Sequence, residues 1–406
     1  MLLYRLLISV FSAGVLLKRP LPAYWRARLG RDLPSPGPTV WLHGASNGEL
    51  ASVRAVLQRL IADRPDLHWR ITANTDTAVA MVNGWGLPRT LACLAPLDLA
   101  GASTRAMRAG PVVAHISLES ELWPHRFRLC PGPVILLGAR MSAGTARTWA
   151  RLPALANRVL SRVTLAIAQD GSSLGRLFDL GLPQPAGGPV VDLKALYLPP
   201  EDQTPDAALS AAFPRAKTWL AASTHDGEDE TILDAHILAL RSTPDLKLIL
   251  APRHPRRAEA LAALITAKGL TCARRSAGEA PDAQVYLADT MGEMALWYAL
   301  AGRVFIAGTL TDRGGHTPYE PAHFGAALLH GPDTRNFRAA FDRLAQAQAA
   351  RHVKDAATLA EALTALRKPD DQMALGRAAQ DALAQDIDLD ALTARIRDAL
   401  PSPRPA

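Results

Sequence analysis

The sequence TVWLHGASNGE at residues 39–49 contains the pattern that decides the fold. Thr39–His43 is a short apolar run of the kind that forms a buried strand. A glycine-containing turn follows it and leads into a helix-length segment, Glu49–Ala62. A strand followed directly by a helix is the repeating unit of parallel α/β sheets, so this stretch predicts an α/β fold.

The same alternation continues on the C-terminal side of this stretch. Further helix-length segments are Glu228–Leu240, Arg256–Lys268 and Glu293–Ala301. The pattern predicts parallel sheets covered by helices on both faces. The other predicted strands are Val112–Leu118, Val134–Leu137, Val163–Ala168, Trp219–Ala222, Lys247–Ala251, Val285–Ala288, Val304–Ala307 and Ala327–His330.

The chain has 406 residues, which is long for a single core, and prolines cluster between residues 181 and 216. We therefore expect two Rossmann-like domains, with a ligand site in the cleft where the carboxyl ends of their strands face each other. The predicted ranges are a membrane-associated helix with a basic segment at 1–31, an N-terminal domain at 32–195, and a C-terminal domain with terminal helices at 196–406.

The formal charge of +7 is concentrated at the N-terminus. Residues 1–31 hold six of the 45 basic residues and no acid, which leaves 39 positive against 38 negative residues in the remainder. A nearly neutral body argues against nucleic-acid binding, which favours a basic stripe on the folded domain. The three cysteines are far apart and form no CxxC pair, which argues against a disulfide framework or a zinc site.

The first residues include an uncharged apolar run, Leu6–Leu17. Its twelve residues would span about 18 Å as a helix, against a hydrocarbon core of about 30 Å. Lys18, Arg19 and Pro20 follow directly, where a signal peptide would have a small-residue cleavage site. We expect a retained anchor or interfacial helix with Trp25 at the headgroup level and the body on the cytoplasmic side. An ordinary buried first helix is the alternative.

Two motifs of the N-terminal half follow predicted strands. Glu49, near Ser46, stands in the first turn of a helix, where a partly buried carboxylate could take a proton from an attacking hydroxyl. The alternative is an acid that only favours the helix dipole. Glu119, Glu121 and Trp123 follow Val112–Leu118 and suit a sugar, although a cap with a packed tryptophan is equally compatible.

Four loops of the C-terminal half also follow strands and suit an anion or a sugar nucleotide. They contain Ser223 with His225, Arg253 between two prolines, the segment at 289–293, and the paired glycines before Glu320. Each motif is weak alone, but their succession predicts a nucleotide-binding C-terminal half and an acceptor-binding N-terminal half.

Together these motifs resemble those of bacterial 3-deoxy-D-manno-octulosonic acid (Kdo) transferases, the glycosyltransferases of lipid A biosynthesis. The matching pieces are HGASNGE at 43–49, ESELWP at 119–124, ARMS at 139–142, ASTHDGEDE at 222–230, PRHP at 252–255, DTMGE at 289–293, GGHTPYEP at 314–321 and GPDTRNF at 331–337. The resemblance implies a GT-B fold, a CMP-Kdo donor and a tetraacylated lipid A precursor as acceptor, at the cytoplasmic face of the inner membrane. We further expect transfer with inversion and no cofactor, because CMP carries a single phosphate and no metal ion is needed to bridge a pyrophosphate.

The resemblance also assigns residues. Glu49 matches the general base, and the possible further donor or acceptor contacts are Ser46, Glu121, Lys194, Ser223 and His225. The donor-binding positions are Pro252, Arg253, Met291, Gly292, Glu293, Thr317, Pro318, Tyr319 and Glu320. The chain departs from the family pattern at Thr317, His125 and Gly138, where the family usually has Asn. Another GT-B transferase or epimerase, and a non-catalytic lipid-binding relative, remain alternatives.

Overall fold

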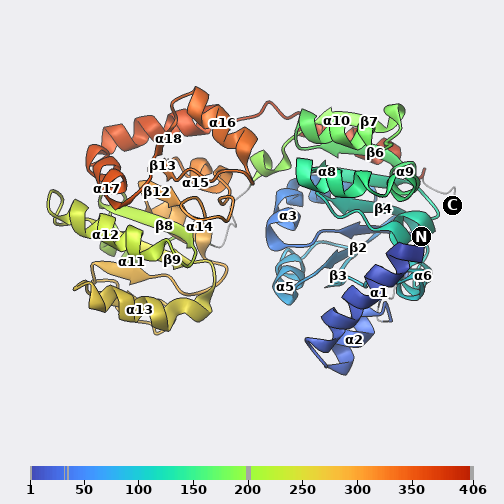
Figure 1. The fold of residues 1–406 in the computed structure, drawn as a ribbon, viewed down its shortest axis with the longest axis horizontal. Helices are drawn as coiled ribbons and strands as arrows, with labels where there is room; N and C mark the ends of the chain where they lie inside the picture. Colours follow the sequence, from blue (N-terminus) through green and yellow to red (C-terminus); the bar gives the residue numbers. More distant parts are fainter. Residues whose placement is uncertain (1, 32, 34–35, 198–202, 403–406) are drawn as a thin grey trace. The chain divides into compact units, whose positions relative to one another are not determined.

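The computed structural model of the chain describes residues 2–31, 33, 36–197 and 203–402 (Figure 1). It divides into two compact units, Met1–Leu196 with Asp386–Ala406, and Tyr197–Gln385. Within the described residues, each unit contains one seven-stranded sheet whose neighbouring strands are all parallel. The predicted parallel α/β fold class is therefore confirmed.

The sheet of the first unit has the order β3-β2-β1-β4-β5-β6-β7. In the register of its centre, Leu42 of β1 lies opposite Ile71 of β2 and Ile116 of β4. The chain order reverses between β1 and β4, and such a switch point is where open α/β sheets bind ligands. The strands are β1 (Thr39–His43), β2 (His68–Ala73), β3 (Thr90–Leu94), β4 (Val112–Leu118), β5 (Val134–Ala139), β6 (Val163–Ala168) and β7 (Gly187–Val190).

Helices pack on both faces of this sheet because alternate strand residues point to opposite faces. Val40 and Leu42 join the core formed with Leu57 of α4, whereas Trp41 packs with Ala106 of α6 on the other face. The helices are α1 (Leu2–Leu17), α2 (Pro22–Arg28), α3 (Asn47–Ser52), α4 (Arg54–Asp63), α5 (Asp76–Gly84), α6 (Ala100–Arg108), α7 (Pro124–Leu129), α8 (Ala143–Ala150), α9 (Pro153–Leu160), α10 (Gly171–Asp179) and α19 (Leu389–Ala399), with 3-10 turns η1 (Gln184–Ala186) and η2 (Leu193–Leu196).

The sheet of the second unit has the order β10-β11-β9-β8-β12-β13-β14, with its switch point between β8 and β12. Its strands are β8 (Thr218–Thr224), β9 (Lys247–Pro252), β10 (Cys272–Arg274), β11 (Val285–Leu287), β12 (Arg303–Ile306), β13 (Ala327–His330) and β14 (Ala350–His352). Its helices are α11 (Ala207–Ala212), α12 (Asp229–Leu240), α13 (Ala258–Ala267), α14 (Met294–Leu300), α15 (Tyr319–His323), α16 (Arg338–Gln346), α17 (Ala356–Ala365) and α18 (Pro369–Leu383), with η3 (Arg215–Lys217) and η4 (Pro255–Arg257).

The C-terminal helix corrects the predicted domain ranges. Residues 386–406 belong to the first unit and not to the predicted C-terminal domain at 196–406. The reason is an apolar face on α19, because Leu392 and Ile396 join the core that contains Leu57 of α4. The predicted helix 49–62 is likewise two helices, α3 and α4, which Val53 separates.

The N-terminal helix α1 has two different faces. Ile8 and Ser12 are buried against the unit, and the Tyr4 hydroxyl donates a hydrogen bond to the buried carboxylate of Asp98 on the same side. In the chain as described, no helix combines the length and the apolar character needed to cross a membrane. The exposed apolar residues of α1 are Leu3, Leu6, Leu7, Val10, Phe11 and Leu17.

Candidate active site

Glu49 lies at the switch point of the first sheet, directly after β1. Ser46 caps α3, and Glu49 is the third residue of that helix. Its carboxylate folds back and accepts hydrogen bonds from the backbone N–H of Ala45 at 2.8 Å and from the Ser46 hydroxyl at 3.0 Å. Ser46 therefore orients the candidate base, although sequence reasoning had placed it only as a possible substrate contact.

The environment of Glu49 favours a carboxyl group that exchanges protons near neutral pH. Burial raises the pKa of Glu49 to about 7, and the charges of Glu119 and Glu121 act in the same direction. The hydrogen bonds from Ala45 and Ser46 oppose this rise without cancelling it. A general base is most effective when its pKa lies near the working pH, so this position suits proton abstraction.

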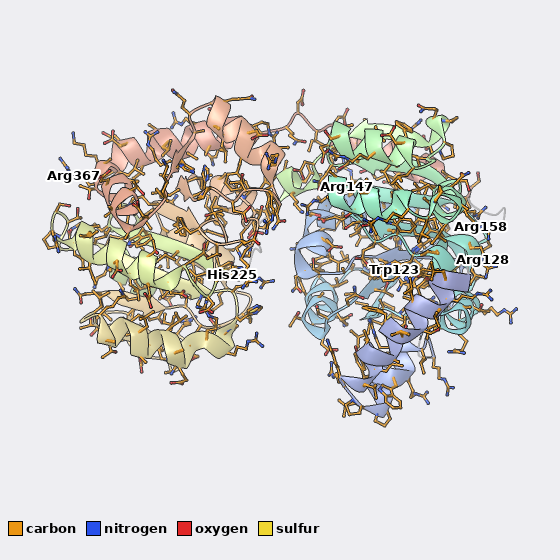
Figure 2. All side chains as sticks on the ribbon, viewed as in Figure 1. Trp123, Arg128, Arg147, Arg158, His225 and Arg367 are labelled. Carbon is orange, nitrogen blue, oxygen red and sulfur yellow. The ribbon has the colours of Figure 1, made fainter. Side chains whose placement is uncertain are left out.

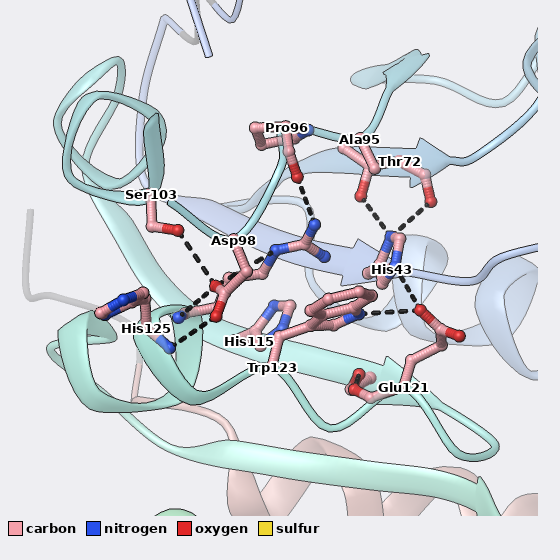
Figure 3. Close-up of polar contacts among 12 residues, drawn as sticks. His43, Thr72, Ala95, Pro96, Asp98, Ser103, His115, Glu121, Trp123 and His125 are labelled. Atoms are coloured by element: carbon pink, nitrogen blue, oxygen red, sulfur yellow. Dashed lines mark hydrogen bonds and ion pairs between the residues drawn. The ribbon is translucent and has the colours of Figure 1, made fainter. Parts of the chain in front are cut away.

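Glu121 is held by two neutral donors rather than by a cation (Figure 3). The His43 Nε2 atom lies 3.2 Å from its Oε2 atom, and the Trp123 indole N–H donates to the same oxygen at 2.8 Å. Burial lowers the pKa of His43 to about 4, so the imidazole is neutral. Because an ionised carboxylate can only accept, we place the imidazole proton on Nε2, which donates to Glu121, while Nδ1 lies 3.0 Å from the hydroxyl and 3.1 Å from the carbonyl of Thr72.

Glu119 directly follows β4 and lies in the left-handed backbone region, with φ of 47°. Its carboxylate forms an ion pair with Lys194 of η2 at 2.7 Å, and both side chains are largely buried. They line a small pocket with Gly138 and Asp192. A non-glycine residue at positive φ at a strand end is typical of a constrained functional loop. The motif ESELWP predicted this loop, but not that Glu119 is the partner of Lys194.

In the second unit, three of the predicted loops meet near the switch point between β8 and β12. The Nε2 atoms of His225 and His316 are 2.9 Å apart, and their rings are within 5° of parallel. His254, after β9, contacts His225 edge to face. Burial, the charge of His225 and then that of Arg253 lower the pKa of His316 to about 4. His316 was not among the predicted site residues, although it stands inside the GGH motif.

Arg253 is exposed, directly after the buried Pro252 that ends β9. In the described residues no hydrogen bond or ion pair engages its guanidinium, whereas Arg257 is bound to Asp229. Figure 2 shows His225 at this end of its unit. A charged fork beside neutral imidazoles suits a phosphate or a carboxylate. Ser223, in the left-handed region at φ 62°, lies where the register of β8 against β9 shifts between Ala222 and Thr224.

The loop after β11 is held by arginines. Asp289 is buried and accepts hydrogen bonds from Ser276 and Arg274. Glu293 forms an ion pair with Arg275 at 2.8 Å. Burial alone would raise the pKa of Glu293, but the hydrogen bonds from Arg275 and Thr290 lower it. Among the predicted donor contacts here, Met291 is 56% exposed and Gly292 has a φ of 89°.

The last predicted donor loop, at residues 317–320, is shaped by contacts of Tyr319 and Thr317. Tyr319 is buried, and its hydroxyl accepts a hydrogen bond from Arg343 of α16. Thr317 accepts a hydrogen bond from the Tyr319 backbone N–H at 3.3 Å, so it shapes the turn before α15. Glu320 follows Pro318 in the first turn of that helix.

Comparison with known proteins identifies the family. The family model of 3-deoxy-D-manno-octulosonic-acid transferases (kdotransferases) matches residues 23–195. The curated Kdo transferase of Haemophilus influenzae is 32% identical over 362 residues, which cover 86% of this chain and 83% of that protein. The chain belongs to the Kdo transferase family.

Other relatives agree with this membership. The Kdo transferase of Bordetella pertussis is 31% identical over 87% of this chain and 85% of its own length. The transferase is thus a glycosyltransferase of lipopolysaccharide core synthesis.

A solved structure of low sequence identity supports the fold of this transferase. A UDP-GlcNAc 2-epimerase from Neisseria meningitidis covers 89% of this chain and 99% of its own, with 12% identity and a TM-score of 0.59. The C-terminal CMP-Kdo binding domain of WaaA from Acinetobacter baumannii is 32% identical over 44% of this chain and 96% of its own, with a TM-score of 0.41. Within the described residues of this transferase, no group of three His, Cys, Asp or Glu side chains is arranged to hold a metal ion.

Proposed function

We propose that the transferase moves Kdo from CMP-Kdo to the tetraacylated lipid A precursor, lipid IVA, with inversion at the anomeric carbon. The observation that carries this proposal is the state of Glu49, a partly buried carboxyl group at a switch point with a pKa of about 7. Such a group is half ionised at neutral pH and can accept a proton from an alcohol in the transition state.

Glu49 removes the proton from an acceptor hydroxyl as the oxygen attacks the anomeric carbon of Kdo. The new C–O bond forms as the bond from that carbon to the CMP phosphate breaks, and CMP leaves with the bonding electrons. The proton remains on Glu49 and is then released to water. Near this base, Glu121 supplies a carboxylate that can accept hydrogen bonds from the acceptor substrate, and Trp123 supplies an aromatic ring for its sugar.

We assign CMP-Kdo binding to the second unit, because its loops carry a cationic guanidinium group and neutral imidazole groups. Arg253 provides a guanidinium for the phosphate of the donor, and the pair His225 and His316 lies beside it. Interactions that strengthen as negative charge develops on the leaving phosphate accelerate the chemical step.

The proposed location is the cytoplasmic face of the inner membrane, with α1 in the interface. The sixteen residues of α1 would reach about 24 Å, and one face of the helix already packs on the unit. The opposite face offers exposed leucines, and Arg5 and Arg128 are both near enough to His125 to lower its pKa. Figure 2 marks Arg128 and Arg158 on the same unit. An apolar face beside cations suits an anionic membrane surface.

The test is transfer by the purified full-length chain, given CMP-Kdo and lipid IVA, with the product mass as the readout. An added mass of one Kdo, or of a small number of them, is the expected result, and free CMP should inhibit more strongly than UDP. No product with CMP-Kdo, or stronger inhibition by UDP, would overturn the assignment of donor and acceptor.

A further inference from the structure

One buried carboxylate, that of Asp98, joins the N-terminal helix to the segment that follows Trp123, and Figure 3 shows this carboxylate beside His125. Asp98 is fully buried and accepts the hydroxyl hydrogen of Tyr4 at 2.7 Å. The same carboxylate accepts the backbone N–H of His125 at 2.8 Å and that of Arg126 at 2.9 Å. Asp98 therefore binds α1 and the first turn of α7 at once, across 94 residues of sequence.

A second set of contacts ties α2 to the same short segment before α6. The guanidinium of Arg28 donates to the carbonyl of Ala95 at 2.6 Å, and the backbone N–H of Leu97 donates to the carbonyl of Arg28 at 2.7 Å. The guanidinium of Arg126 donates to the carbonyl of Pro96. Residues 95–98 thus form hydrogen bonds with α1, α2 and α7.

The contacts continue from α7 to the candidate acceptor loop. The guanidinium of Arg126 is buried and lies over the rings of Trp41, at 5.2 Å, and Trp123, at 5.1 Å. Trp123 in turn donates to Glu121. A shift of α7 would therefore move the Trp123 ring and the carboxylate that it holds.

We infer that Tyr4 and Asp98 are positioning residues for the loop Glu119–Pro124, so that the N-terminal helix orients the acceptor side of the active site in addition to any role in attachment. This inference rests on the proposed function, in which that loop contacts the acceptor. The two roles lie on opposite faces of α1, because Tyr4 faces the unit while the exposed leucines face away from it.

The variant Tyr4→Phe separates these roles, since it removes one hydroxyl and leaves the apolar face intact. With full-length enzyme and lipid IVA in detergent micelles, we expect kcat/KM for the acceptor to fall about tenfold, as for loss of a hydrogen bond to a charged acceptor. The KM for CMP-Kdo and binding to anionic phospholipid vesicles should stay within about twofold of the wild-type values, because neither depends on that hydroxyl.

Ser9→Ala is the matched control, because among the described residues the Ser9 hydroxyl donates only to the Arg5 carbonyl of its own helix. Its activity should equal that of the wild-type enzyme. Asp98→Asn should reproduce the acceptor defect of Tyr4→Phe, and the double variant should be less than additive, because both changes affect the hydrogen bond between Tyr4 and Asp98. If Asp98→Asn does not fold, the Tyr4→Phe result alone decides.

Wild-type acceptor kinetics in Tyr4→Phe would overturn the inference, and so would a loss of vesicle binding that matches the loss of activity. Both outcomes require an active wild-type enzyme. Absence of Kdo transfer by the wild-type enzyme would instead overturn the proposed function, so the two failures are distinguishable.

Discussion

The ammonium group of Lys194 lies 2.7 Å from the carboxylate of Glu119, and this ion pair is next to the candidate base. The charge of Glu119 contributes to the raised pKa of Glu49. Lys194 offsets part of that charge, so the pair sets how easily Glu49 becomes ionised.

Replacing Lys194 by Met should raise the pKa of Glu49 further, because Glu119 would remain as an uncompensated carboxylate. The pH at which activity reaches half its plateau should therefore move upward. The measurement is kcat/KM for the acceptor against pH. Lys194→Arg keeps the charge and should leave the profile near that of the wild type. An unchanged profile in Lys194→Met would contradict the electrostatic link.

The pH dependence of the wild-type enzyme follows from Glu49 itself. A general base must be ionised, so kcat/KM should be low below pH 6, rise through a pH of about 7 and level off above it. Below that pH the activity should fall about tenfold for each pH unit. Rates measured from pH 5 to 9 check this, and constant activity between pH 5 and 7 would exclude Glu49 as the titrating base.

Charge reversal at Arg253 tests the donor site. The change Arg253→Glu should weaken CMP-Kdo binding by about 100-fold or more, because an anion would meet a carboxylate in place of a guanidinium. Arg256→Glu is the matched control, since Arg256 is also exposed and follows in η4, while Arg253 is the arginine whose charge adds to burial in lowering the pKa of both His225 and His316. Titration calorimetry with CMP measures the affinity of both variants. Equal weakening in the two variants would indicate a general charge effect and not a phosphate contact.

The exposed face of α1 predicts binding to membranes. Leu6 and Val10 are 64% and 67% exposed, and replacing both by Ser should weaken binding to anionic vesicles by about tenfold. Met373→Ser, at an exposed apolar position on α18, should leave vesicle binding unchanged. Co-sedimentation at constant salt measures both variants. Unchanged binding by the double variant would remove this face from the attachment surface.

Strands with apolar runs could be predicted from the sequence, and several others could not. β1, β4, β6 and β13 have the predicted limits. β2 was missed because Arg70 interrupts its pattern, yet the arginine is buried and its guanidinium donates to the carbonyls of Ala106 and Leu33.

The edge strands were missed for a different reason. β7 reads GGPV, and β10 and β14 have three residues each, so their pattern is too short or too poor in β-branched residues to be recognised. The helix α19 belongs to the first unit because Leu392 and Ile396 pack in the core of that unit. The order of the sequence does not reveal this packing.

The candidate site was predicted where motifs follow strands. Glu49, Glu121, Arg253 and His225 all stand at the carboxyl ends of sheet strands, as expected. Their partners were not predictable, because they come from distant segments. Asp98 stands in no motif, and only the fold brings it to Tyr4 and to α7.

The most direct measurement of the central claim is single-turnover transfer by Glu49→Gln beside its affinity for CMP. The amide keeps the size of the side chain and cannot accept the proton, so we expect transfer to fall by about 100-fold or more while CMP affinity stays within about twofold. Transfer at a near wild-type rate in a correctly folded Glu49→Gln enzyme would contradict the account.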